Sequence, residues 1–441
     1  MTETPLYTAL LTHQSLRRAS FHTPGHKSNP SALPPNLLSL DYTELPDTDS
    51  LFEAEGPILQ AEEAAAALFG TKRTLFSAGG CTLCIQAMLR LAAPCGGRVL
   101  CSRVLHRSAV NTMALLGLTP VWAMPEDLCA AVEQHPDVKA VYITSPNYYG
   151  ELADVPALAA ACKNHGIPLL MDNAHGAHLF FTDPILHPIA LGASMTACSA
   201  HKTLNVLTGG AWLHIADERF ADEAKGAMSL FGSTSPSYPI MASLDLCRAW
   251  LEEHGKAAFA QLQTRVCNLK AALQSMGLHV LGMGPDDSPL RWDPTRITVG
   301  TASIGLTGTE AAEHLRRAGC EPEYADSRCV VCIVTPFNME GDFARLEAGF
   351  RGLLRHAGAP LSAGNTIAQL PPLPPVRASL REAVLAKAES VPLASSAGRI
   401  AAEPACPCPP GVPVVMPGEE ITREAVEFLR SYGFSSIKVL K

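Results

Sequence analysis

Two short segments contain residue types that could do covalent chemistry. Lys202 lies within residues 199–203 (SAHKT), and Asp172 lies upstream of it. A lysine amine can condense with the aldehyde of pyridoxal 5'-phosphate, and a carboxylate can keep the ring nitrogen protonated so that the ring accepts electrons. Ser199 and His201 stand where their side chains could donate hydrogen bonds to the phosphate. The spacing therefore predicts a binding site for this cofactor.

Each of these residues also has a plainer explanation. A lone lysine is usually a solvated surface residue, and a lone aspartate often caps a helix. Here Asp172 directly follows the apolar run 167–171, and Lys202 comes shortly after a second run at 194–199; both runs are typical of short buried strands. Ligands of open α/β sheets bind at the carboxyl ends of the strands. We therefore expect Asp172 and Lys202 at the same edge of one sheet.

A glycine-rich turn supplies further candidates. Gly80, Cys81 and Thr82 lie between an expected strand and an expected helix. Backbone N–H groups at a helix N-terminus form an anion site suited to a phosphate, although a tight turn needs glycine whatever it binds. His106 follows another expected strand. Its ring could lie flat on a planar cofactor, or it could simply cap the helix that follows.

Composition excludes several classes of protein. The chain has 441 residues, of which 47% are hydrophobic, so it can bury a large core. A formal net charge of −8 without a Lys/Arg block argues against a nucleic-acid partner. The first residues do not resemble a signal peptide, and no apolar run of about 18 residues occurs. We expect a cytoplasmic protein with no membrane segment.

Fourteen cysteines are present, and in such a chain we expect reduced thiols. Two Cys-x-x-Cys pairs are candidate zinc ligands. Cys81 and Cys84 enter a helix, and Cys329 and Cys332 lie in a strand-like run where their side chains would point to opposite faces. Neither pair indicates a metal site, and no metal is expected.

Alternating strands and helices predict an α/β fold with a mainly parallel sheet. A long helix is expected from residue 243 to about 276, and shorter ones over 5–16 and 379–390. The expected regions are an N-terminal arm (1–55), a large cofactor-binding domain (56–293), a small α/β domain (294–356), a linker rich in proline and glycine (357–375) and a C-terminal domain (376–441).

Several motifs occur in one order along the chain: FHTPGHK at 21–27, the segment from 43 to 57, DNAHGAH at 172–178, SAHKT at 199–203 and STSPSY at 233–238. Together they resemble the bacterial Orn/Lys/Arg decarboxylases, in the shorter form that lacks an N-terminal wing domain. The resemblance covers nearly the whole chain. It implies a fold of the aspartate-aminotransferase type (fold type I), which uses pyridoxal 5'-phosphate.

The resemblance also implies roles for single residues. Lys202 would hold the cofactor, Asp172 would pair with its ring nitrogen, and His106 would stack on its ring. Ala174 would pack on the opposite face, with His175 nearby. The residues that would bind the phosphate are Ser199, His201, Gly80, Cys81 and Thr82.

An active site between two subunits is implied as well, and hence a homodimer or a larger homo-oligomer. Ser233 and Thr234 would then reach the neighbour's phosphate. The chain departs from the family where Cys81 replaces the usual serine or threonine and where Asn173 replaces a common acidic residue. A thiol is a weaker donor than a hydroxyl, so cofactor affinity could be lower, unless backbone N–H groups hold the phosphate.

The expected activity is decarboxylation of a basic L-amino acid to its amine and CO2 in polyamine metabolism. Arginine is favoured over lysine and ornithine, and the catalytic residues would be Lys202, His106 and Asp172. Glu321, Glu323 and Asp326 are candidates to bind the distal cation, although a solvated edge also explains them. An aminotransferase or lyase, and a paralogue that binds the cofactor without turnover, remain as alternatives.

Overall fold

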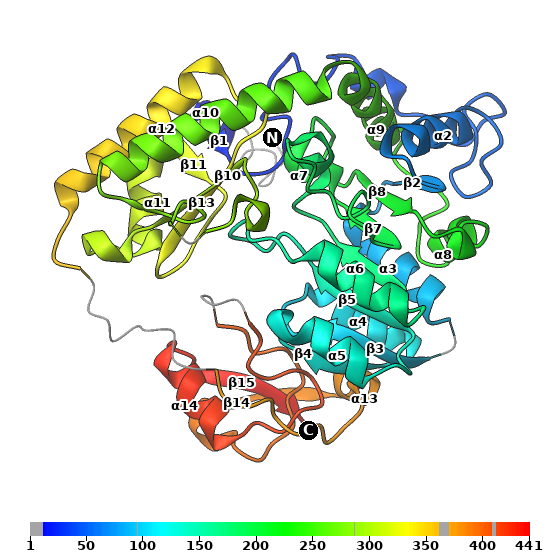
Figure 1. Cartoon of the computed structure of the whole chain (residues 1–441), viewed down its shortest axis with the longest axis vertical. Coiled ribbons are helices and arrows are strands. Elements are labelled where there is room, and N and C mark those ends of the chain that lie inside the picture. Colours follow the sequence, from blue (N-terminus) through cyan, green and yellow to red (C-terminus); the bar gives the residue numbers. More distant parts are fainter. Residues whose placement is uncertain (1–11, 95, 286, 361–369, 408–411) are drawn as a thin grey trace, which may run out of the picture.

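The computed structural model describes residues 12–94, 96–285, 287–360, 370–407 and 412–441. A central sheet with helices on both faces forms one part of the molecule (Figure 1). A smaller sheet lies beside it under a long helix, and the C-terminal region packs against the far edge of the central sheet. Most of the helix expected over 5–16 lies outside the described residues.

The central sheet has seven strands in the order β2-β8-β7-β6-β5-β3-β4. Neighbours from β7 to β4 are parallel, whereas β8 is antiparallel to both β2 and β7. The predicted mainly parallel α/β sheet is therefore confirmed. The strands are β2 (Arg73–Ser77), β3 (Gly97–Ser102), β4 (Leu118–Ala123), β5 (Ala140–Thr144), β6 (Leu169–Asp172), β7 (Met195–Cys198) and β8 (Ala211–Ile215).

Helices cover both faces of this sheet, and its inner strands are buried along their length. Such double coverage explains why these strands read as continuous apolar runs instead of alternating ones. The helices of this part are α2 (Pro57–Phe69), α3 (Gly80–Ala92), α4 (Arg107–Leu116), α5 (Leu128–Gln134), α6 (Val155–Asn164), α7 (Ala200–Thr203) and α8 (Ala224–Ser229).

A long helical segment joins the central sheet to the smaller one. It consists of α9 (Tyr238–Trp250), a π-helical turn (Leu251–Gly255) and α10 (Lys256–Ser275). The long helix expected from 243 to 276 is thus confirmed, with an unpredicted π turn. A Cβ on Gly255 would lie 2.6 Å from the Phe181 ring, so the helix can approach the large part closely only with glycine there.

The smaller sheet is antiparallel, in the order β12-β13-β10-β9. A separate short strand, β1 (Ala19–Phe21), pairs in parallel with β11 (Cys320–Pro322) and brings the N-terminal arm to this part of the molecule. The remaining elements are β9 (His279–Val280), β10 (Arg296–Gly300), α11 (Gly308–Arg317), β12 (Tyr324–Ala325), β13 (Cys329–Ile333) and α12 (Glu340–Leu353).

The C-terminal region contains α13 (Leu380–Leu385), β14 (Ala388–Pro392), α14 (Arg423–Ser431) and β15 (Ser436–Leu440). The helix expected over 379–390 is wrong in its second half. Ser379 and Glu382 form a capping box that starts α13, but residues 388–392 pair with β15 along their whole length. A long-range strand partner here overrides the local helical pattern.

A buried ion pair ties this region to the central sheet. Arg103 follows β3, is 0% exposed, and donates to both carboxylate oxygens of Glu419 at 2.6 and 2.7 Å. Within the described residues the cysteines are free, as expected, and none of the helices is long and apolar enough to cross a membrane.

Candidate active site

Asp172 is the last residue of β6 and is 1% exposed. Its Oδ2 accepts hydrogen bonds from the Tyr142 hydroxyl at 3.2 Å and the Thr144 hydroxyl at 3.4 Å. Its Oδ1 accepts one from the Ala174 backbone N–H at 3.2 Å. The carboxylate is therefore held in place by neighbouring strands and by the turn that follows it.

Burial dominates the charge state of Asp172. It raises the pKa of the carboxyl, and the charge of Lys202, followed by a smaller effect of His106, opposes this rise without cancelling it. A protonated ring nitrogen in contact with Asp172 would favour the ionised form, which is the form the predicted role requires.

Lys202 lies in α7, directly after β7, and its Nζ is 3.1 Å from the Nε2 of His175. Burial, and then the charge of Lys202, lowers the pKa of His175 well below its ordinary value. The ring is therefore neutral, and Nε2 can accept a hydrogen bond from the lysine amine. His175 Nδ1, which is buried, has no hydrogen-bond partner among the described residues.

His106 is the N-cap residue of α4. Its Nδ1 accepts a hydrogen bond from the Ser108 backbone N–H at 3.2 Å, so the neutral ring carries its proton on Nε2. Burial lowers the pKa of His106, and the nearby Asp172 raises it. The helix-capping role of His106 is therefore confirmed, and its stacking on the cofactor ring stays a prediction.

The glycine turn opens α3, and Gly80 has a φ of 70° that other residues rarely adopt. The Gly80 N–H is taken by the Gly209 carbonyl at 2.8 Å. No side chain caps this helix, so the N–H groups of Cys81 and Thr82, together with the helix dipole, form an anion site. The geometry suits a phosphate bound by backbone groups.

The Cys81 thiol is directed toward Asp172. It is buried and donates a hydrogen bond to Asp172 Oδ1 at 4.0 Å. Burial, and then the charge of Asp172, raises the pKa of this thiol well above its ordinary value. The departure from a hydroxyl residue at this position therefore alters the surroundings of Asp172, whereas the phosphate turn keeps its backbone donors.

The other expected phosphate ligands differ in their exposure and in their hydrogen bonds. Ser199 is 2% exposed and directly precedes α7. His201 Nδ1 is 2.9 Å from the Gly210 carbonyl, to which it can only donate, so the ring could give a second hydrogen bond only as an imidazolium. Ser233 and Thr234 are exposed, and no contact joins them to Lys202 or Asp172 within the described part of the chain.

The N-terminal motif at residues 21–27 packs between α7 and the smaller sheet. The Gly25 N–H donates to the His201 carbonyl at 2.7 Å, and a Cβ on Gly25 would lie 2.3 Å from a backbone oxygen. Lys27 Nζ donates to the Ile333 carbonyl at 3.0 Å. Since these are backbone contacts, this motif positions the elements around Lys202.

The three candidate residues for the distal cation have separate roles. Glu321 is paired with Arg18 at 2.6 Å and with Arg316 at 2.5 Å. Asp326 accepts the Tyr149 hydroxyl at 2.7 Å and the N–H groups of a tight turn. The sequence could not separate them, because it does not show which arginines and amides lie opposite each carboxylate.

Glu323 differs from the other two carboxylates because no arginine pairs with it among the described residues. It accepts one hydrogen bond, from the Thr23 N–H at 2.7 Å. It is near enough to His201 for its charge to raise that ring's pKa against the effect of burial. Of the three candidates, Glu323 is therefore the one left to meet a cationic ligand.

Tyr142 and Thr144 were missed by the sequence analysis. Both lie on β5, where Thr144 is paired with Asp172 across the parallel ladder. A tyrosine in an otherwise apolar buried strand needs a hydrogen-bond partner, and this was the available signal. Which strand adjoins β6 could not be read from the sequence, so neither could the partner.

The side chains present fit pyridoxal phosphate. A buried carboxylate lies within charge range of a lysine amine, the nearby His175 has an unpartnered nitrogen, and an uncapped helix N-terminus can take the phosphate. A cation at the ring nitrogen, an aldehyde at the amine and a phosphate at the helix would each meet complementary groups.

Comparison with known proteins agrees with this geometry. Residues 4–130 and 126–281 match the family model "Orn/Lys/Arg decarboxylase, major domain", and residues 369–435 match its C-terminal domain. An arginine decarboxylase of Bacillus subtilis (strain 168) is 30% identical over 97% of this chain and 93% of its own length. The constitutive lysine decarboxylase of Escherichia coli (strain K12) is 23% identical over 96% of this chain and 76% of its own length.

Solved structures show the same fold. The structure of E. coli constitutive lysine decarboxylase has a TM-score of 0.78 at 20% identity and covers 99% of this chain and 82% of that chain. A structure of SPT with PLP has a TM-score of 0.60 at 14% identity and covers 77% of this chain and 88% of that one. The chain therefore has the fold of PLP-dependent enzymes of fold type I, and it belongs to the Orn/Lys/Arg decarboxylase family of amino-acid decarboxylases.

Proposed function

We propose that this enzyme uses pyridoxal 5'-phosphate to decarboxylate L-arginine to its amine and CO2. The observation that supports the cofactor is the buried Asp172 carboxylate within charge range of Lys202, beside an uncapped helix N-terminus. When bound, the cofactor supplies an electron sink for the pair released as the bond from Cα to the carboxylate breaks.

Each residue of the site then has a defined task. Asp172 keeps a proton on the ring nitrogen, and the hydroxyls of Tyr142 and Thr144 hold its carboxylate in place. Lys202 would hold the cofactor through its amine, which can react with the aldehyde. The neutral His175 accepts a hydrogen bond from that amine and so orients it.

Loss of CO2 leaves an electron pair at Cα that must receive a proton. His106 carries a proton on Nε2. Lys202 would carry one on Nζ when its amine is not attached to the cofactor. Both groups contribute to the electrostatics of the Asp172 carboxyl, which supports this assignment. We assign the proton donor to this pair.

Arginine is the proposed substrate because the arginine decarboxylase of B. subtilis is the more similar of the two named relatives, at 30% against 23% identity. Glu323 is the proposed partner of the guanidinium. The amine product belongs to polyamine metabolism, and we propose a cytoplasmic enzyme.

A comparison of substrates tests this function. Purified enzyme supplied with pyridoxal phosphate is given L-arginine, L-lysine or L-ornithine, and kcat/KM is measured for each. We expect the highest value for arginine and no turnover by Lys202→Ala. A higher value for lysine or ornithine would refute the choice of arginine while leaving the reaction intact.

A further inference from the structure

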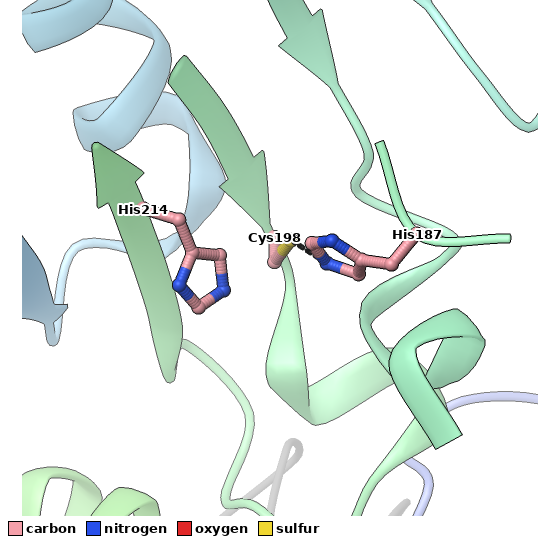
Figure 2. A group of neighbouring side chains, drawn as sticks. All are labelled: His187, Cys198 and His214. Carbon is pink, nitrogen blue, oxygen red and sulfur yellow. Dashed lines mark hydrogen bonds between the residues drawn. The ribbon is translucent and has the colours of Figure 1, made fainter. Parts of the chain in front are cut away.

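A second group of ligating side chains lies outside the proposed active site. It consists of His187, Cys198 and His214, each 0% exposed. A ring nitrogen of each histidine and the Cys198 sulfur all lie within 4.8 Å of one another. Figure 2 shows the two rings on either side of the Cys198 side chain, with a nitrogen of each ring turned toward it.

The central sheet brings these residues together on one face. Within β7, Ala197 is paired with Asp172, so Cys198 points to the opposite face from the Asp172 carboxylate. His214 is on the adjacent strand β8, and His187 is on the loop between β6 and β7. The cluster is therefore separated from the proposed cofactor site by the sheet itself.

Two of the three ligand atoms are close to the spacing of a metal site. His187 Nε2 lies 3.3 Å from Cys198 Sγ. With bonds from zinc to nitrogen of about 2.0–2.1 Å and to sulfur of about 2.3 Å, neighbouring ligand atoms are about 3.4–3.8 Å apart. The third atom, on His214, lies within 4.8 Å of both and would have to move closer to complete such a site.

The contacts of His214 leave one of its ring nitrogens able to bind an ion. Its Nδ1 lies 2.9 Å from the Thr74 hydroxyl, whereas its buried Nε2 has no hydrogen-bond partner among the described residues. Histidine ligands usually donate their other ring N–H to an oxygen, and Thr74 supplies that oxygen. The lone pair of Nε2 is then left without a partner, which is costly in a buried site unless a cation occupies it.

One neighbouring side chain would stabilise a thiolate at Cys198. The Asn173 side-chain amide donates to its sulfur at 3.3 Å, which stabilises negative charge there. Burial raises the pKa of the Cys198 thiol, so without an ion the site holds a neutral thiol. Metal binding must displace that proton and should weaken as the pH falls.

One contact opposes binding. His187 Nδ1 accepts a long hydrogen bond of 3.3 Å from the Ile189 N–H, and coordination through Nε2 would move the ring proton to Nδ1. The loss of one such long hydrogen bond is a small cost beside the coordination bonds that the ion would form.

We propose that His187, Cys198 and His214 bind one thiophilic metal ion of the zinc(II) or copper(I) class. Two imidazoles and a thiolate suit both ions. Copper(I) would make an electrically neutral site, whereas zinc(II) would leave one positive charge and call for a fourth ligand. None of the site's three ligands belongs to either Cys-x-x-Cys pair.

Competition titrations of the full-length enzyme test the site. Protein treated with chelator is titrated with zinc(II) against a chromophoric chelator, and with copper(I) under anaerobic conditions against a copper(I) indicator. The variants are Cys198→Ala and His214→Gln, and the matched control is Cys247→Ala, which alters another buried thiol. Cobalt(II) is added separately to the unaltered enzyme as a spectroscopic probe.

We expect one ion of zinc(II) or copper(I) per chain, with affinity at least about tenfold weaker in both cluster variants and unchanged in the control. Cobalt(II) should give a charge-transfer band from the thiolate. The proposal is wrong if neither ion binds the unaltered enzyme more tightly than it binds the cluster variants. Should those variants fail to fold, the absence of a thiolate band with cobalt(II) in the unaltered enzyme would also overturn it.

Discussion

The charge at Asp172 depends on hydroxyl donors from the neighbouring strand. Tyr142 donates at 3.2 Å and Thr144 at the longer distance of 3.4 Å, both to Oδ2. A hydrogen bond to a charged group contributes about 1.5–3 kcal/mol. Both donors stabilise the ionised carboxylate. An ionised Asp172 in turn stabilises the proton that it is proposed to keep on the ring nitrogen.

Removal of the Tyr142 hydroxyl should therefore slow the reaction. We expect Tyr142→Phe to lower kcat/KM for arginine by about tenfold, and Thr144→Val to lower it less because its bond is longer. Steady-state kinetics at saturating cofactor measures both effects. Kinetics of Tyr142→Phe equal to those of the unaltered enzyme would show that Asp172 does not depend on this bond.

Glu323 is expected to select the distal cation of the substrate. Glu323→Gln keeps the shape but removes the charge, so KM for arginine should rise by about tenfold while kcat changes little. Glu321→Gln is the matched control, since Glu321 already pairs with Arg18 and Arg316. An equal rise in KM for both variants would mean that Glu323 has no special role.

The contacts between elements explain what the N-terminal motif does. Lys27 is buried where the arm meets β13, and burial lowers the pKa of its amine to about 7 from an ordinary value of 10.5. Between these two pH values the unfolded chain binds a proton that the folded chain has released. Stability contributed by this group therefore rises with pH over that interval, by up to about 1.4 kcal/mol per pH unit.

Lys27→Met should remove this dependence. Urea unfolding at pH values from 7 to 10 is expected to show the unaltered protein gaining stability relative to the variant as the pH rises. Lys270, whose pKa burial lowers to about 8, adds a similar rise, but it is present in both proteins. Parallel curves for the two proteins would contradict the buried, neutral state of Lys27.

Most of the elements could be predicted from the sequence, because local patterns determine them. The apolar runs before Asp172 and Lys202 became β6 and β7, and the turn at Gly80 opened α3. The second half of the helix over 379–390 could not be predicted correctly, since its strand partner β15 is distant in the sequence. The orientation of the Cys81 thiol likewise depends on packing between strands that the sequence does not display.

At the scale of the whole molecule, the predicted site residues divide into two sets. Lys202, Asp172, His106 and His175 come together within one chain. Ser233 and Thr234 remain exposed, and the Ser233 hydroxyl is hydrogen-bonded at Ser235, within its own turn. A homodimer in which that turn reaches the neighbour's phosphate stays a prediction.

Mixing two inactive variants tests the shared site. Lys202→Ala lacks the lysine, and Thr234→Asp would place a negative charge against the neighbour's phosphate. If the turn acts across the interface, a mixed dimer contains one intact site, so random reassociation should restore about a quarter of the full activity. Failure of a fully exchanged mixture to recover any activity would contradict a shared site.

The central claim is that the bond from Cα to the carboxylate breaks. The most direct test is the simultaneous measurement of CO2 and amine from L-arginine by the enzyme with pyridoxal phosphate. The account predicts equal amounts of the two products, and neither product from Lys202→Ala. Formation of a 2-oxo acid without CO2, or binding of the cofactor with no turnover of arginine, lysine or ornithine, would contradict it.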